Sequence, residues 1–234
     1  MHIRVHPCFF RSREQLKTIW GITMRFLITA GPTREYIDTV RFISNASSGL
    51  MGFAVAAAAI EAGHEVTLLA GPVSLPPPEG AKVVPFTSVE DLASALAERC
   101  DACDVLVMAA AVGDFQLANG PAATKLSRKA GPITISLEPT DDILARVAQA
   151  KKPGQIVVAF AVEQGTPEDI LAKARQELAD KHADFSVANT PAAFNSAESL
   201  ACILDAENIL LPWAKRPKKD LARQLVRIIS TPTN

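Results

Sequence analysis

Short apolar runs that alternate with helical segments constrain the fold of this chain more than any other feature of the sequence. The runs 25–29, 65–70 and 82–86 are each closed by Gly, Pro or polar residues, and an Ala-rich helix is expected at 50–63. Parallel strands need such crossover helices, and strands buried on both faces read as continuous apolar runs. The pattern therefore predicts an α/β fold built on a mostly parallel sheet.

The alternation continues to the end of the chain. The remaining expected strands are 104–110, 133–138, 155–160 and 184–189, and the remaining expected helices are 88–100, 140–150, 166–181 and 218–229. Ser88, Thr140 and Thr166 are the expected N-caps, because their hydroxyl groups can accept a hydrogen bond from the first turn. Two last apolar runs straddle Ala206 and Glu207 and predict a hairpin. The expected fold is thus Rossmann-like, with helices on both faces of the sheet and a small C-terminal β-hairpin extension.

Composition narrows the class of protein. The formal net charge of the 234 residues is -1, which predicts no nucleic-acid and no membrane partner. Residues 1–23 precede the first strong strand and are expected to be a disordered or non-native extension, and 24–234 a single α/β domain. Cys100 and Cys103 form a CxxC without a second ligand pair, so structural thiols are favoured over zinc or redox chemistry. Free thiols indicate a cytoplasmic location.

The stretch 29–52 is the longest connection in the pattern and the first candidate for function. A βα loop usually has about 2–6 residues, and loops much longer than that inside compact domains are often functional. This one ends in Asn45, Ser47, Ser48, Gly49 and Gly52 at an expected helix N-terminus. Free backbone N–H groups there favour a phosphate or carboxylate, whereas N-capping by Ser48 and close packing by Gly52 are the alternative reading.

Two common nucleotide motifs are absent from the sequence. The first loop has no GxGxxG and the second strand ends without an acidic residue, which disfavours nicotinamide binding; no GxxxxGK[ST] motif appears either.

Loops after the later strands add candidate side chains. Ala109, Ala110 and Ala111 leave room for a flat ligand, and Asp114 follows them, as a ribose or metal ligand or as a solvated carboxylate. Lys125 lies on a basic loop that is either solvated or closes over a polyphosphate.

Two more segments are candidates at the same sheet edge. Asp141 and Asp142 open an expected helix, either as dipole complements or as nucleotide contacts. Phe160 ends its strand either as core or as a stacking surface.

At these residues the chain resembles the phosphopantothenate–cysteine ligase family, over about 24–230. The motif ITAGPTREYIDTVRFISNASSGLMG carries most of the resemblance, with AAAVGDF, TKLSRK, EPTDDIL, VAFAVE and VANTPAAFNS. The resemblance implies an enzyme that joins 4′-phosphopantothenate to cysteine through an acyl-nucleotide intermediate in coenzyme A biosynthesis. It implies CTP or ATP as co-substrate, Mg²⁺, a homodimer and no flavin, since the flavin-dependent decarboxylase half is not part of the resemblance.

The resemblance also implies roles for single residues. Asn45 and Lys125 are the expected catalytic residues. Expected nucleotide-binding residues are Ala109, Ala110, Asp114, Lys125, Asp141, Asp142, Ile143, Leu144, Phe160 and Lys181. Expected phosphate- and substrate-binding residues are Gly31, Asn45, Ser47, Ser48, Gly49, Gly52 and Ala111.

The sequence departs from the family pattern at three lysines. Leu50, Ser127 and Glu177 stand where family members often have lysine, which removes positive charge near the nucleotide and leaves the base open between CTP and ATP. Arg128, Lys173 and Arg175 are candidates to compensate. An NAD(P)-dependent oxidoreductase and a non-catalytic family member remain the alternative functions.

Overall fold

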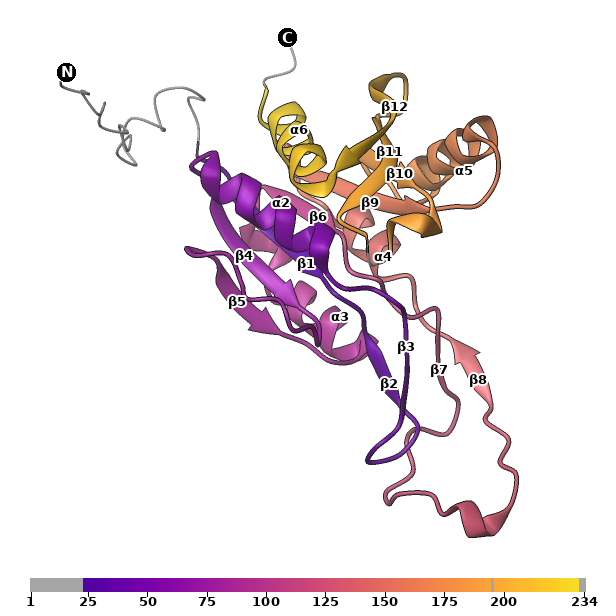
Figure 1. Cartoon of the computed structure of the whole chain (residues 1–234). Coiled ribbons are helices and arrows are strands. Elements are labelled where there is room, and N and C mark those ends of the chain that lie inside the picture. Colours follow the sequence, from indigo (N-terminus) through magenta and orange to yellow (C-terminus); the bar gives the residue numbers. More distant parts are fainter. Residues whose placement is uncertain (1–22, 195, 232–234) are drawn as a thin grey trace, which may run out of the picture.

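The computed structural model describes residues 23–194 and 196–231. The expected extension 1–23 lies outside the described residues except for Thr23. Eight strands form one sheet in the order β12-β11-β10-β9-β6-β1-β4-β5 (Figure 1). The parallel strands are β1 (Arg25–Ala30), β4 (Glu65–Ala70), β5 (Lys82–Pro85), β6 (Val105–Met108), β9 (Ile156–Val162) and β10 (Phe185–Asn189).

The predicted C-terminal hairpin extends this sheet. β11 (Glu198–Leu204) pairs antiparallel with β10, and β12 (Ile209–Pro217) pairs antiparallel with β11 and forms the edge. The predicted α/β class, the mostly parallel sheet and the hairpin are therefore confirmed.

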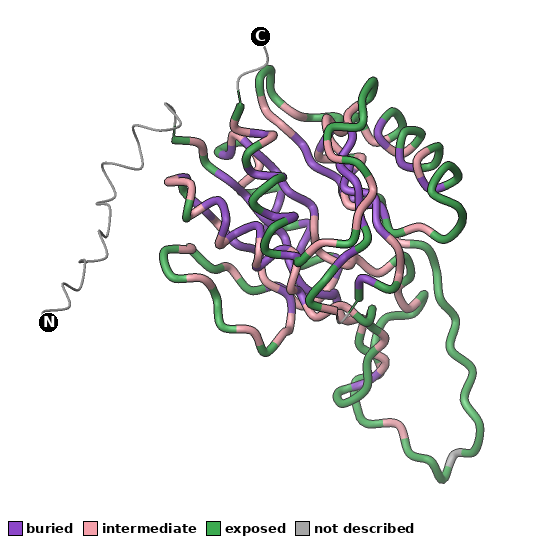
Figure 2. Tube along the Cα trace, turned by 45° about the horizontal axis from the view of Figure 1, so that its top comes forward, coloured by how far each residue is buried: buried purple, intermediate pink, exposed green. Residues whose placement is uncertain are grey.

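Helices cover both faces of the sheet, as the alternation of helices and strands predicts. One face carries α2 (Leu50–Glu61) and α6 (Lys218–Ser230), which pack on Phe26 and Ile28. The other face carries α3 (Val89–Ala97) and α4 (Ile143–Gln149), which pack on Leu27, and α5 (Pro167–Asp180), which packs near the hairpin. Figure 2 shows the buried residues gathered in the sheet and on the inner faces of the helices. Among the described residues, each helix is too short or too polar to cross a bilayer.

Local capping rules predict the starts of α3 and α5. Ser88 and Thr166 each form a capping box, with Asp91 and Asp169 three residues later. The prediction for α4 is wrong: Asp142 is its N-cap and accepts from Ala145 N at 2.9 Å. Thr140 instead lies two residues before this cap and donates its hydroxyl to the carbonyl of Gly113 at 2.7 Å.

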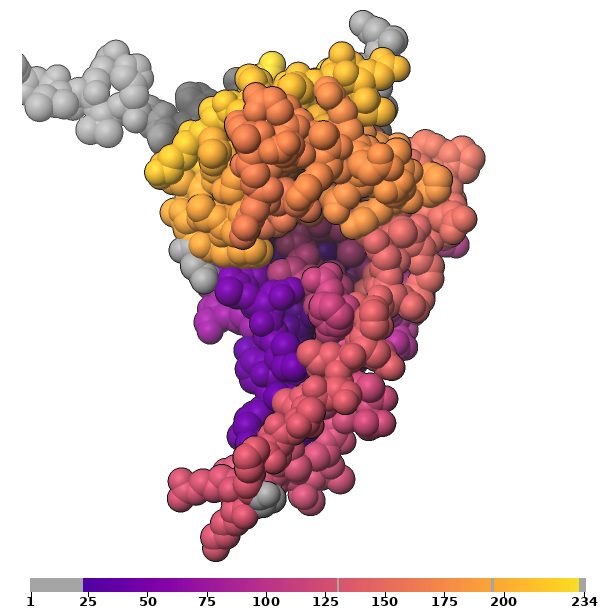
Figure 3. Space-filling view, turned by 90° about the vertical axis from the view of Figure 1, so that its right-hand side faces the viewer, coloured from indigo at the N-terminus to yellow at the C-terminus, as the bar shows by residue number. Residues whose placement is uncertain are grey.

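A two-part arm projects from the body of the domain and was not predicted (Figures 1 and 3). Within 29–52, β2 (Arg34–Tyr36) pairs with β3 (Phe42–Ser44). β7 (Phe115–Leu117) pairs with β8 (Leu137–Pro139). We define the arm as residues 34–44 and 115–139. The expected sheet strand at 133–138 is therefore wrong, because most of its alternating residues stay exposed on the arm and only its end enters β8.

One buried carboxylate holds the two halves of the arm together. Asp38 is fully buried and accepts from the guanidinium of Arg41 and from Leu126 N, the latter at 3.0 Å. The hydrogen bonds from Arg41 and from the backbone hold the pKa of Asp38 well below its ordinary value. Arg34 also stacks over the Phe42 ring at 4.3 Å. Specific contacts therefore stabilise the arm, although its sequence is typical of a loop.

Candidate functional site

The main cavity lies where the strand order reverses. From β1 the chain moves outward through β4 and β5, then returns to the other side of β1 with β6. In an open parallel sheet a crevice forms at the carboxyl ends of strands at such a point. A cavity of about 730 Å³ lies there, bounded by segments that follow β1, β6, β9 and β10. Figure 3 shows the hollow between the orange part of the surface and the indigo and magenta part.

The cavity brings most of the predicted site residues together. Those that line it are Asn45, Ser47, Ser48, Gly49, Ala109, Ala110, Ala111, Asp114, Asp141, Asp142, Ile143, Leu144, Phe160 and Lys181. These residues come from five separate stretches of sequence. The long connection 29–52, the alanine segment after β6 and Phe160 of β9, all named as candidates from the sequence, therefore meet at one edge of the sheet.

The N-terminus of α2 forms one wall of the cavity. Gly49 is its N-cap in a left-handed conformation, φ 76°, so the expected capping by Ser48 is wrong. Gly49 N instead donates to Ser47 Oγ at 3.3 Å. No side chain caps this helix end, and Leu50 and Met51 of its first turn line the cavity. Uncapped N–H groups at a helix start favour an anion.

Gly31 and Gly52 lie beneath this wall and do not line the cavity. A Cβ on Gly49 would lie 3.3 Å from Gly31 N, so the two glycines allow close approach of the chain. A Cβ on Gly52 would lie 2.5 Å from Ala30 Cβ. These two positions therefore shape the site through packing, which favours the packing interpretation of Gly52 over direct ligand contact.

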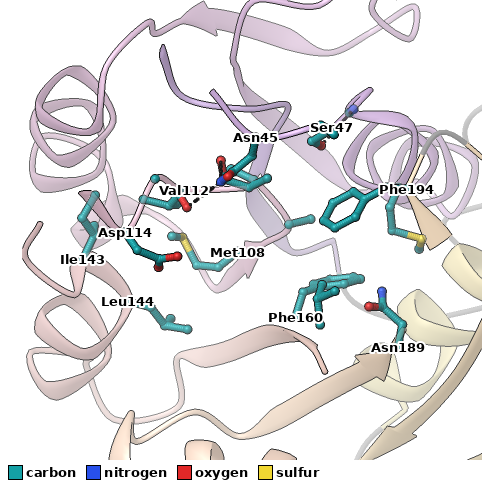
Figure 4. Close-up of a pocket in the computed structure, with 18 of the residues that line it drawn as sticks. Asn45, Ser47, Met108, Val112, Asp114, Ile143, Leu144, Phe160, Asn189 and Phe194 are labelled. Atoms are coloured by element: carbon teal, nitrogen blue, oxygen red, sulfur yellow. Dashed lines mark hydrogen bonds between the residues drawn. The ribbon is translucent and has the colours of Figure 1, made fainter. Parts of the chain in front are cut away.

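Asn45 connects the first loop to the end of β6. Its Nδ2 donates to Val112 O at 2.9 Å and to Ala111 O at 3.2 Å (Figure 4). Both amide hydrogens are used in this way, which leaves Oδ1 as the atom for a ligand. Ala110 N donates to Thr29 Oγ1 at 3.0 Å, so the alanine floor is also tied to β1.

Acidic groups gather at the opposite end of the cavity. The Asp114 carboxylate points into the cavity (Figure 4). Asp141 is exposed and lies 3.7 Å from Arg146, and Asp142 lies 3.5 Å from Lys181 Nζ. Lys181 therefore already has carboxylate neighbours in the structure.

A metal cluster is not formed by the described part of the chain: no group of three His, Cys, Asp or Glu side chains is placed to hold an ion. The Asp114 carboxylate nevertheless fits Mg²⁺, which proteins often bind through one or two carboxylates together with substrate phosphates.

The predicted basic loop lies on the arm. Lys125, Arg128 and Lys129 are exposed, and Lys125 does not line the cavity. The neighbouring Leu126 is fixed by Asp38 and by Arg41, which donates to Leu126 O at 2.7 Å. Closure of this loop over a phosphate therefore stays a prediction.

Asn189, Phe194 and Lys218 are among the cavity residues to which the sequence analysis gave no role. Asn189 ends β10, and its buried Oδ1 has no hydrogen-bond partner among the described residues. Phe194 follows the 3₁₀ turn Pro191–Ala193 and lies with Phe160 on one side of the cavity (Figure 4). Lys218 begins α6 and is 8% exposed. The rule that ligands lie beyond strand ends would have indicated Asn189, but no local signal marks Lys218.

The CxxC lies away from the cavity. Cys103 Sγ donates to Cys100 O at 3.3 Å, and Gln155 Nε2 donates to Cys100 O at 2.6 Å. These contacts close the turn before β6, in agreement with the structural interpretation.

Comparison with known proteins assigns the family. Residues 22–232 match the family model described as DNA/pantothenate metabolism flavoprotein C-terminal domain. The chain belongs to this family. It is 45% identical over 172 residues to the coenzyme A biosynthesis bifunctional protein CoaBC of Mycobacterium tuberculosis, covering 70% of this chain and 41% of that protein.

Two further comparisons, one with a curated protein and one with a solved structure, also show similarity over most of this chain. A cysteine/cysteine sulfinic acid decarboxylase from an unknown prokaryotic organism is 38% identical over 215 residues, covering 88% of this chain and 58% of that protein. The crystal structure of the C-terminal domain of a CoaBC protein is 32% identical with a TM-score of 0.72, covering 88% of this chain and 94% of that domain. The chain thus spans about half the length of the curated relatives but nearly all of the family's C-terminal domain.

The three departures from the family lysines have different surroundings. Leu50 lines the cavity directly. Glu177 lies 3.5 Å from Lys181. Ser127 accepts from Lys129 N on the arm. Of the suggested compensating cations, Lys173 is already paired with Glu163 at 2.8 Å.

Proposed function

We propose that this chain joins 4′-phosphopantothenate to cysteine through an acyl-nucleotide intermediate, as a ligase of coenzyme A biosynthesis. The observation that carries the proposal is the single cavity that gathers Asn45, the open N-terminus of α2, the alanine floor and Asp114 from distant segments. The similarity to CoaBC proteins, whose name places them in coenzyme A biosynthesis, supports the same reaction.

The chemistry requires two anionic substrates in one site. The carboxylate of phosphopantothenate attacks the α-phosphorus of a nucleoside triphosphate, and the bond to the pyrophosphate breaks. The cysteine amine then attacks the acyl carbon, and the bond between this carbon and the bridging phosphate oxygen breaks. The nucleoside monophosphate leaves with that oxygen and the electron pair, and the amine loses a proton. Uncapped N–H groups at α2 stabilise phosphate charge, and Asn45 orients the intermediate through its remaining amide oxygen. Asp114 would help to hold Mg²⁺, which would offset phosphate charge.

A pyrophosphate-release assay tests this reaction. Release should require both phosphopantothenate and a triphosphate, and product should require cysteine. Running CTP and ATP in parallel identifies the base, for which we expect CTP to be preferred. If neither triphosphate supports release with this acid, the proposed reaction is wrong. A protein that binds both substrates without turnover would be the non-catalytic alternative.

The NAD(P)-dependent alternative has less support. The loop after β1 runs into a hairpin and carries no glycine fingerprint, so the backbone cradle for a dinucleotide pyrophosphate is not the usual one. Enhancement of NADPH fluorescence on mixing with the protein would favour that alternative, and we expect none.

We propose further that the protein is a cytoplasmic homodimer assembled through the arm. Of the thirteen large apolar side chains that are exposed within 23–194 and 196–231, seven lie on the arm: Tyr36, Val40, Phe42, Phe115, Ile133, Ile135 and Leu137. Small two-stranded sheets with open edges need a partner to be stable. A second copy would offer both matching edges and matching apolar groups.

Sedimentation of two charge variants separates this interface from the C-terminal hairpin. Phe115→Asp on the arm should give a monomer, whereas Ile209→Asp on the exposed β12 should leave the dimer intact. The opposite pattern would move the interface to the hairpin, and a wild-type monomer would exclude both.

A further inference from the structure

Lys218 is an unusual residue for the first position of a helix. A cation there opposes the helix dipole. Its side chain is nevertheless 8% exposed and lines the main cavity. Burial of an ammonium group is costly unless a counter-charge is near. The position therefore needs a physical explanation.

Within the described part of the chain, this ammonium group has one hydrogen-bond partner, which is neutral. Lys218 Nζ donates to Ala193 O at 2.7 Å. Among the described residues, no carboxylate oxygen lies within 4.0 Å of it, and the nearby Asp220 is paired with Arg223. By contrast, Lys181, the other cation that lines the cavity, has two carboxylates at 3.5 Å. Burial without a counter-ion lowers the pKa of Lys218 below its ordinary value.

The helices α2 and α6 bring Lys218 to the anion-favouring wall. They run in parallel, since Arg223 contacts Glu61 at 3.1 Å and Ser230 contacts His64 at 2.9 Å farther along. Their N-termini therefore open at the same side, as Figure 1 also shows. Leu50 at the start of α2 and Lys218 at the start of α6 both line the cavity.

The start of α2 lacks the positive charge that a lysine at position 50 would supply. Leu50 supplies no cation at the start of α2, where the family pattern often has lysine. Lys218 supplies one from the neighbouring helix, and the uncapped N–H groups of α2 face the same space. Phosphate oxygens are the complement of both groups.

We propose that Lys218 is a phosphate-binding residue that takes a substrate phosphate at the shared end of α2 and α6, with Ala193 O holding the ammonium group in place. The identity of the ligand rests on the proposed function. Two sources offer the same chemistry: the phosphate chain of the nucleoside triphosphate and the phosphate of phosphopantothenate.

Calorimetric titration of Lys218→Met tests the proposal. The probes are inorganic pyrophosphate, CTP, ATP, phosphopantothenate and unphosphorylated pantothenate. Loss of a charge-assisted contact should weaken at least one phosphate-bearing probe by about tenfold or more. Loss confined to triphosphate and pyrophosphate would assign the nucleotide, whereas loss for phosphopantothenate but not pantothenate would assign the acid.

Matched variants separate binding from folding. Lys218→Arg, which keeps the charge, should retain most of the affinity, and Lys219→Met, on an exposed neighbour, should bind every probe as the wild type does. The melting temperature of Lys218→Met should change little, because relief of a buried charge without a counter-ion offsets the loss of the hydrogen bond to Ala193 O. If Lys218→Met does not fold, Lys218→Gln carries the same expectation.

Two results would overturn the assignment: unchanged affinity of the uncharged variant for all phosphate-bearing probes, or no binding of any of them by the wild type. Loss of pyrophosphate affinity in Lys218→Met together with a failed pyrophosphate-release assay would keep the phosphate site and reject the proposed reaction.

Discussion

Replacing Gly52 with alanine tests the closest contact between a helix and the sheet beneath the cavity. In an exposed helix interior this change should stabilise the protein by about 1 kcal/mol, because glycine is a poor helix former. Here the new Cβ would lie 2.5 Å from Ala30 Cβ and 2.8 Å from Thr29 O. Carbon atoms normally meet at about 3.5–4.0 Å, so α2 must move by roughly 1 Å.

The neighbouring atoms cannot yield to this Cβ. Thr29 and Ala30 are fully buried in β1, which is hydrogen-bonded to β4 and β6 on either side. Overpacking a close-packed core costs about 1–3 kcal/mol, and backbone contacts this short belong to the upper half of that range. After subtraction of the helix-propensity gain, Gly52→Ala should lower the free energy of unfolding by about 1–2 kcal/mol.

Urea denaturation followed by far-UV circular dichroism measures this difference. Ala57→Gly, at a half-buried position on the same helix, measures the local cost of glycine and should destabilise by up to about 1 kcal/mol. If Gly52→Ala and Ala57→Gly both destabilise the protein, packing outweighs helix propensity at Gly52. A Gly52→Ala variant as stable as the wild type, or more so, would refute the close-contact argument. The displaced α2 should also weaken pyrophosphate binding.

Three further predictions follow from the geometry of the site and arm. Asn45→Ala should abolish product formation while changing the free energy of unfolding by less than about 1 kcal/mol, since its two hydrogen bonds are exposed; full turnover would remove Asn45 from the mechanism. Asp38 has a lowered pKa, so its stabilising effect is present above the unfolded carboxyl pKa of about 3.9 and is lost as the pH falls toward the folded value. The stability gap between wild type and Asp38→Asn should therefore shrink on going from pH 7 to pH 3, and a gap independent of pH would contradict this assignment. Incubation with a metal chelator should leave the melting temperature unchanged, because Cys100 and Cys103 serve the turn before β6; a lower melting temperature would indicate a bound ion.

The central sheet could be predicted from the sequence because its signal is local. Continuous apolar runs such as 25–29 and 65–70 are buried on both faces, so burial and sequence pattern coincide there. Capping boxes at Ser88 and Thr166 are likewise complete within four residues. The cap of α4 was missed because Thr140 and Asp142 are both common N-cap residues within three positions, and local rules do not choose between them.

The arm could not be predicted for a different reason. Ile133 and Ile135 alternate as in a half-buried strand, yet they are exposed in this chain. An alternating pattern predicts that one face of a strand is buried, but it does not identify the element that packs against this face. The contact that orders the arm, Asp38 with Leu126, joins residues 88 positions apart.

The same distinction applies to the site. Asp114 comes after β6 and Phe160 lies near the end of β9, and parallel topology brings these carboxyl ends to one edge; Asn45 lies in the long connection after β1. Lys218 reaches that edge only because the antiparallel hairpin returns the chain and α6 then packs beside α2. When tertiary packing alone brings a residue to the site, its own segment contains no periodic pattern or motif that predicts this position.

The distribution of charge in the cavity gives an orientation for the proposed nucleotide. One end carries uncapped N–H groups of α2 and the unpaired ammonium group of Lys218; the other carries Asp114, Asp141 and Asp142. Without a cation between them, phosphates placed at the acidic end would meet like charge in a partly enclosed space, where screening by water is weakened. Phosphates of the nucleotide at the α2 and α6 end would avoid that repulsion, and the base would then lie toward Leu144 and Phe160, which also line the cavity.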